Sequence, residues 1–88
     1  MCRAIRPLFN FAPPATDEEI RAASLQYVRK VSGYVRPSQA NAAAFARAVD
    51  EVAEATRRLV SSLSSPAPPR DRETEALRAR ERSRRRFA

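Results

Sequence analysis

Arginine is the residue type in this sequence best suited to chemistry with another molecule, and it is concentrated near the end of the chain. Between residues 76 and 88, six arginines stand against a single glutamate. They are Arg78, Arg80, Arg82, Arg84, Arg85 and Arg86. A guanidinium group forms paired hydrogen bonds with a phosphate, and the formal net charge of +7 favours approach to a polyanion. The first functional hypothesis is therefore sequence-independent contact with nucleic acid, either RNA or DNA. The alternative is a solubilising tail whose arginines reflect codon bias.

The rest of the sequence offers little that could catalyse a reaction. There is no histidine and only one cysteine, Cys2, which leaves no histidine base, no cysteine–histidine pair and no usual zinc ligand set. A single glycine is too few for a glycine-rich phosphate loop. Asp17, Glu18 and Glu19 point in different directions on a helix, and a capping role accounts for them. We therefore expect no enzyme activity, cofactor, metal site or small-molecule substrate.

Two helices are predicted ahead of the basic segment, and the first spans residues 17–32. Thr16 and Glu19 have the spacing of a capping box, and Gly33 follows the last periodic residue as a left-handed C-cap. At 100° per residue, one face of this helix is formed by Ile20, Ser24, Tyr27 and Val31, with Ala23 and Val28 at its edges.

The second predicted helix spans residues 39–64, with Ser38 as its N-cap. Its apolar positions recur at intervals of four and three residues, which is the heptad pattern of helices that pack along one seam. The interaction face predicted from this pattern consists of Phe45, Val49, Val52, Leu59 and Leu63. Because this stripe is wider than one shorter helix covers, the second functional hypothesis is a protein-interaction module. It would act either as a homodimer or as an adaptor for another protein.

The predicted fold is all-α, a two-helix hairpin closed by an extended N-terminal arm over residues 1–12. The arm carries two aromatic residues, Phe9 and Phe11, which we expect to cover the hairpin core; stacking on nucleic-acid bases is the alternative. Prolines after the second helix indicate a spacer. This divides the chain into a hairpin domain over 1–64, a spacer over 65–69 and a tail over 70–88. The tail is expected to be either a basic polar helix or disordered.

The composition also bears on location. The sequence contains no apolar run long enough to span a bilayer, and no apolar segment typical of a signal peptide follows the early arginines. One cysteine cannot form a disulfide within the chain, which suits a reducing compartment. We therefore expect a cytoplasmic protein that has no membrane partner.

Several blocks of the sequence together resemble a known family. These blocks are MCRxIRxLFNF, PPATDEEIRAA, LQYVRKVSG and APPRDRE, where x is any residue, and they extend over nearly the whole chain. They are similar to a family of short bacterial proteins known as a domain of unknown function. The resemblance implies a bacterial protein, but it supplies no activity, ligand or site residue.

Overall fold

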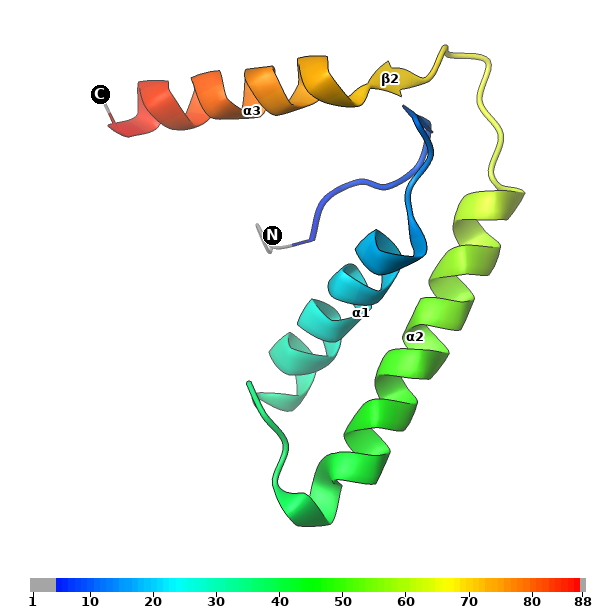
Figure 1. Ribbon diagram of the computed structural model, residues 1–88, viewed down its shortest axis with the longest axis vertical. Helices are drawn as coiled ribbons and strands as arrows, with labels where there is room; N and C mark the ends of the chain where they lie inside the picture. The colour runs from blue at the N-terminus through cyan, green and yellow to red at the C-terminus, as the bar shows by residue number, and fades with distance from the viewer. Residues whose placement is uncertain (1–4, 88) are drawn as a thin grey trace.

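The computed structural model describes residues 5–87, and most of them are helical. The elements in chain order are β1 (Phe11–Ala12), α1 (Asp17–Ser32), the 3-10 turn η1 (Gln39–Asn41), α2 (Ala42–Ser62), β2 (Arg70–Asp71) and α3 (Arg72–Phe87). Helices α1 and α2 form a hairpin, and α3 crosses the end of that hairpin where α1 begins and α2 ends (Figure 1). The prediction of an all-α helical hairpin is confirmed, with one small parallel pairing of β1 and β2 added.

Both ends of α1 are closed by the predicted caps. The Thr16 N–H donates to Glu19 Oε1 at 2.9 Å, and the Glu19 N–H donates to Thr16 Oγ1 at 3.2 Å, which completes a capping box. At the other end, Gly33 adopts a left-handed conformation with φ +80°, and its N–H donates to the Arg29 carbonyl at 2.9 Å. The chain therefore enters and leaves α1 at fixed points.

The second helix differs from its predicted bounds of 39–64. Residues 39–41 form η1, and the regular helix α2 runs from Ala42 to Ser62. Ser38 does not cap a backbone N–H; its hydroxyl instead accepts a hydrogen bond from Asn41 Nδ2 at 2.9 Å. Leu63, with an extended backbone, ends the helix three residues before Pro66. The prolines therefore act after the helix has ended.

The hairpin core follows rows of residues spaced four apart. Ile20, Ser24 and Val28 are buried on α1, and Val49 and Ala53 are buried on α2. A row with this spacing is inclined to the helix axis, so helices packed along it cross at an angle. On α1 the row moves around the helix and away from Tyr27 and Val31, which are 48% and 69% exposed. The prediction that these two residues share the buried face was wrong for this reason, and Val28 belongs there instead.

Small and hydroxyl-bearing side chains allow this close packing. Ala53 is completely buried, and Ser24 is almost so. The Ser24 hydroxyl donates to the Ile20 carbonyl at 2.8 Å, and the Thr56 hydroxyl donates to the Val52 carbonyl at 2.7 Å. Because each hydroxyl is bonded to its own helix, it adds no unpaired polar group to the core.

None of the described helices combines the length and apolar composition needed to cross a bilayer.

Replacing Gly33 tests the left-handed cap. A Cβ at this position would meet no atom within 4 Å, so the cost of Gly33→Ala is backbone strain alone. We expect the free energy of unfolding to fall by about 1 kcal/mol, and Gly33→Asn to cost less because asparagine tolerates this conformation. Urea unfolding followed by circular dichroism measures both values. An alanine variant as stable as the wild type would contradict the cap.

Candidate nucleic-acid interface

The basic segment forms a helix with its own N-terminal cap. The Asp71 carboxylate accepts hydrogen bonds from the Thr74 hydroxyl at 2.7 Å and the Thr74 N–H at 3.1 Å. These bonds, the hydroxyl one foremost, hold the pKa of Asp71 below its ordinary value. Glu73 and Glu75 lie in the first turn and the last arginines in the final turn, which is the favourable order for the helix dipole. Of the two predicted alternatives, the structure has the basic polar helix.

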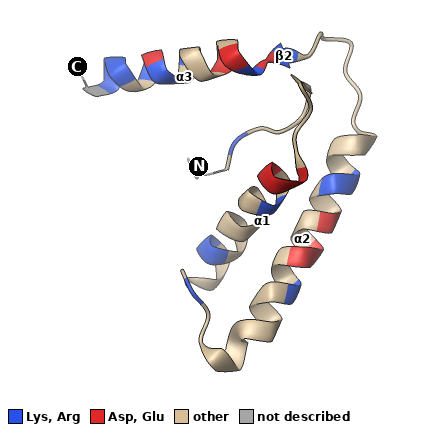
Figure 2. Ribbon diagram, viewed as in Figure 1, with Lys and Arg blue, Asp and Glu red and all other residues tan. Residues whose placement is uncertain are grey.

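Helix α3 presents its arginines to solvent. Every residue from Ala76 to Arg86 is exposed, including Leu77 at 55%. Arg78 Nη1 lies 3.5 Å from Glu75 Oε1, in an ion pair between an exposed arginine and a half-buried glutamate. Among residues 5–87, no ion pair or hydrogen bond involves the side chains of the other five predicted arginines, Arg80, Arg82, Arg84, Arg85 and Arg86. The structure therefore brings all six predicted residues together on one helix, where basic residues predominate in the C-terminal half of the ribbon (Figure 2).

The base of α3 is bonded to the N-terminal arm through backbone atoms. Strand β1 pairs with β2 in parallel, with Phe11 opposite Arg70 and Ala12 opposite Asp71. The Arg70 N–H donates to the Asn10 carbonyl at 2.8 Å. The Asn10 side-chain amide donates to the carbonyls of Ala67 and Pro68, each at 3.3 Å. The last part of the proline-rich segment is thus held against the arm.

Two arginine side chains reinforce this attachment. Arg72 Nε donates to the Pro13 carbonyl at 2.6 Å, and Arg72 Nη1 donates to Glu19 Oε2 at 2.7 Å. The guanidinium carbons of Arg70 and Arg72 lie 5.2 and 5.6 Å from the centroid of the Phe11 ring, within range for cation–π attraction. We call the set Asn10, Phe11, Glu19, Arg70 and Arg72 the α3 anchor.

Glu19 serves both the α1 cap and the α3 anchor. One carboxylate oxygen accepts from Thr16 and the other from Arg72. The hydrogen bond from Arg72, followed by that from the Thr16 N–H, lowers the pKa of Glu19 to about 2. The carboxylate therefore stays ionised across the whole neutral range. The same charged group caps α1 and accepts the hydrogen bond from Arg72 at the start of α3.

Sequence reasoning missed the anchor. It assigned Arg70 and Arg72 to a tail beyond a spacer and expected Phe11 to cover the hairpin. A pairing of two-residue strands has no periodicity that a sequence pattern could reveal. The one available signal was that both partners lie in blocks of the resembled family, LFNF and APPRDRE. The division of the chain into 1–64, 65–69 and 70–88 stays a prediction, to which the anchor adds bonds between its first and last parts.

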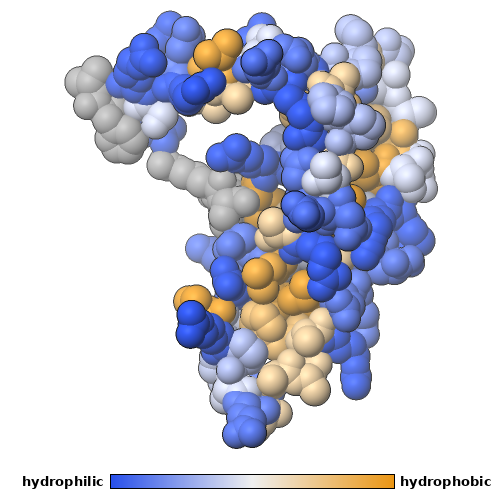
Figure 3. Space-filling model, viewed as in Figure 1, coloured by the Kyte–Doolittle hydropathy of each residue, from blue (hydrophilic) through white to orange (hydrophobic). Residues whose placement is uncertain are grey.

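The predicted interaction face of α2 divides into a covered part and an open part. Val49 is buried, and Phe45 and Val52 are half-buried. Leu59 and Leu63, nearer the end of the helix, are 57% and 45% exposed. Hydrophobic side chains gather over the hairpin, whereas hydrophilic ones cover most of α3 (Figure 3).

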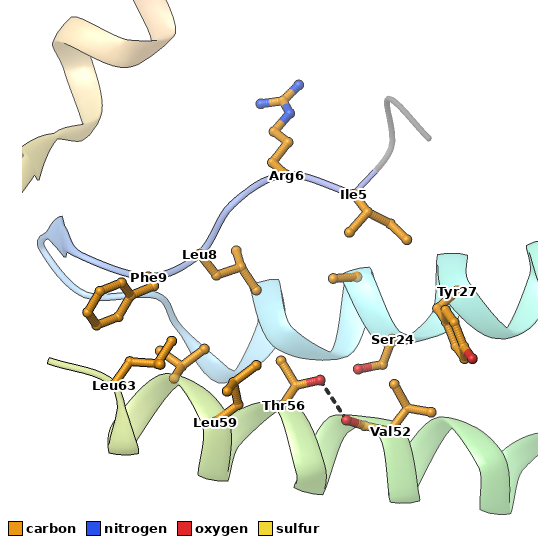
Figure 4. Close-up of a pocket in the computed structure, with 12 residues that line it drawn as sticks. Ile5, Arg6, Leu8, Phe9, Ser24, Tyr27, Val52, Thr56, Leu59 and Leu63 are labelled. Atoms are coloured by element: carbon orange, nitrogen blue, oxygen red, sulfur yellow. Dashed lines mark hydrogen bonds between the residues drawn. The ribbon is translucent and has the colours of Figure 1, made fainter. Parts of the chain in front are cut away.

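The open part belongs to an apolar groove of about 300 Å³ between the arm and the hairpin. Ile5, Leu8 and Phe9 point from the arm toward the helices, whereas Arg6 points away (Figure 4). Tyr27 and Leu59 line the groove from α1 and α2. The arm thus covers the hairpin as predicted, but it leaves space beneath it. The first four predicted arm residues, with Cys2, lie outside the described residues, as does residue 88.

Comparison with models of protein families assigns the chain to one family. Residues 1–78 match the model of a family described as an uncharacterized conserved protein, DUF2277, and the chain belongs to that family. Comparison with curated proteins and with solved structures finds no match. The resemblance to a domain of unknown function is confirmed. The matched region contains the hairpin and the whole α3 anchor but ends at Arg78, so the other five candidate arginines lie beyond it.

The low pKa of Glu19 predicts how acid affects stability. A carboxyl group whose folded-state pKa lies below its ordinary 4.5 contributes stability above about pH 4.5, and this contribution is lost as the pH falls toward 2. Glu19→Gln keeps a capping-box side chain but removes the charge. At pH 7 we expect it to lower the free energy of unfolding by about 1 kcal/mol, a value reduced for solvent screening because Glu19 is 35% exposed.

The difference between wild type and Glu19→Gln should shrink as the pH falls below about 4.5 and be mostly lost at pH 2, where the Glu19 carboxyl group is about half protonated. Urea unfolding at several pH values measures it. Glu18→Gln is the matched control, because Glu18 is exposed and forms no ion pair or hydrogen bond within the described chain. A difference that persists unchanged to pH 2 would contradict the role of the Glu19 charge.

Proposed function

We propose that this protein is a non-enzymatic binding protein that contacts nucleic acid through the arginines of α3, without reading base sequence. The observation that carries the proposal is the set of six exposed arginines on α3, five of which have no acidic partner among the described residues. Such groups form charge-assisted hydrogen bonds with phosphates and release counterions from the nucleic acid. The proposal includes a cytoplasmic location, where nucleic acid is accessible.

The anchor supports this function over that of a solubilising tail. A tail that only adds charge needs neither a capped helix nor a fixed base, whereas α3 has both. A helix that is already formed and attached loses less conformational entropy on binding than a disordered segment does. The arrangement therefore favours contact with a partner over simple solvation.

Replacing all six α3 arginines by glutamine tests the proposal while keeping good helix-forming residues. For the wild type, we expect affinity for DNA or RNA to fall steeply with salt, with a slope of log K against log salt of about −5 for duplex DNA. The variant should lose most of its binding. Fluorescence anisotropy with labelled oligonucleotides at several salt concentrations measures both, and circular dichroism checks that the helices remain.

A matched pair of variants separates α3 from net charge alone. Arg84→Gln with Arg85→Gln and Arg36→Gln with Arg47→Gln remove the same charge, and all four side chains are exposed. Only the α3 pair should weaken binding strongly and reduce the salt slope, by about one for each arginine removed. Equal losses from both pairs would show that total charge, rather than α3, drives binding.

Self-association is a second candidate function, favoured by the apolar groove. Three of the exposed large hydrophobic residues, Tyr27, Leu59 and Leu63, line this one groove. An 88-residue chain buries a limited core, and a second copy that covers α2 would add to it. The heptad series of α2 continues through Leu59 and Leu63, so a second α2 is a fitting partner.

Sedimentation equilibrium tests this second candidate. If α2 pairs with α2 of another copy, the wild type should have twice the monomer mass, and Leu59→Glu should convert it to a monomer, because a charge in an apolar contact loses its hydration. Leu77→Glu is the control, since Leu77 is equally exposed but lies on α3. A wild-type protein that is monomeric at high concentration would rule out the homodimer.

A further inference from the structure

We infer that α3 binds in the major groove of duplex DNA, with arginines on two opposite sides of the helix reaching the two phosphate backbones. This inference rests on the proposed function and narrows it to one form of nucleic acid and one mode of docking. It depends on how the arginines are distributed around α3, on the width of the helix, and on the positions of the two aromatic side chains of the arm.

The arginines of α3 fall into two rows. At 100° per residue, Arg78, Arg82 and Arg85 lie within about 60° of one another, and Arg86 adjoins them. Arg80 and Arg84 lie within about 40° of each other on the other side, about 150° away from the centre of the first row. A helix that rests on a single strand or a flat anionic surface needs one basic face. Two rows on opposite sides fit a groove that has a phosphate backbone along each wall.

The dimensions of α3 fit the same groove. An α-helix with its side chains is about 10–12 Å across, and the major groove of B-form DNA is about 12 Å wide. The major groove of duplex RNA is deep and narrow, which disfavours the same insertion. A helix that lies on a membrane needs an apolar face, but Leu77 is the one large apolar side chain described on α3.

The helix is free to enter a groove along most of its length. Its contacts with the arm are made by Arg70, Asp71 and Arg72 at its base. From Ala76 to Arg86 every residue is exposed, and in the space-filling view this part stands clear of α1 and α2 (Figure 3). The anchor thus holds one end of α3 while leaving the arginine rows accessible.

The two aromatic side chains of the arm, Phe9 and Phe11, offer no stacking surface for single-stranded nucleic acid. Proteins that bind single strands stack bases on exposed aromatic rings. Phe9 instead points toward the hairpin and lines the apolar groove (Figure 4). Phe11 lies beneath the guanidinium groups of Arg70 and Arg72. Neither ring is available beside α3, so the alternative prediction that these two residues stack on bases has no support from their positions.

The test compares three probes of the same length and sequence: duplex DNA, its single strand and duplex RNA. Anisotropy titrations with the full chain should give an affinity for duplex DNA on the order of tenfold higher than for either other probe.

Removing either row of arginines should weaken binding to duplex DNA. Arg82→Gln with Arg85→Gln and Arg80→Gln with Arg84→Gln carry equal charge changes, and each should weaken duplex binding several-fold. Methyl green, which occupies the major groove, should compete, whereas netropsin in the minor groove should not.

The outcomes separate this inference from the function on which it rests. Equal affinity for the single strand, or a row that can be removed without loss, would overturn groove insertion. If the variant with six glutamines still lost binding in that case, α3 would remain a nucleic-acid contact of another geometry. Heparin binding as tight as duplex binding would also overturn the inference. No binding of the wild type to any of these polyanions would overturn both proposals.

Discussion

The hydrogen-bonded ion pair between Glu19 and Arg72 is the contact on which the arrangement of the whole chain depends. Glu19 lies in the first turn of α1, and Arg72 is the first residue of α3, so this bond of 2.7 Å joins the first helix directly to the last. The low pKa of Glu19 follows from the same bond and from the Thr16 cap. The Glu19 carboxylate is already present to cap the start of α1. The contact with α3 therefore requires only that Arg72 reach this carboxylate, and no second acidic residue is needed.

Local signals in the sequence were sufficient for the parts of the fold that local physics controls. The Thr16 and Glu19 cap, the Gly33 stop and the polarity of α3 each depend on residues within one helical turn, and each was predicted. The buried face of α1 was predicted less well, because the choice between Val28 and Tyr27 depends on the angle at which α2 crosses. That angle is a property of two packed helices and appears in neither one alone.

The candidate site likewise has one part that the sequence predicted and one part that it did not. Its six arginines were found from composition, whereas the anchor that positions them joins residues more than fifty positions apart. The family match adds a further distinction, because it contains the hairpin and anchor but ends at Arg78. The hairpin and the anchor therefore lie within the region that the family model matches. Five of the six candidate arginines lie beyond it, so the proposed nucleic-acid contact depends mainly on residues outside that region.

The parallel pairing of β1 with β2 makes the order of folding matter. Bringing Asn10 and Ala67 together in an open chain closes a loop of 57 residues, at an entropy cost of about 3.6 kcal/mol from length alone. Once α1 and α2 have packed, the start of one and the end of the other are already neighbours, and most of that cost disappears. This difference in entropy favours packing of the hairpin before the two strands pair. A substitution that loosens the hairpin restores part of the cost and weakens the attachment of α3, so the orientation of its arginines depends on core packing away from them.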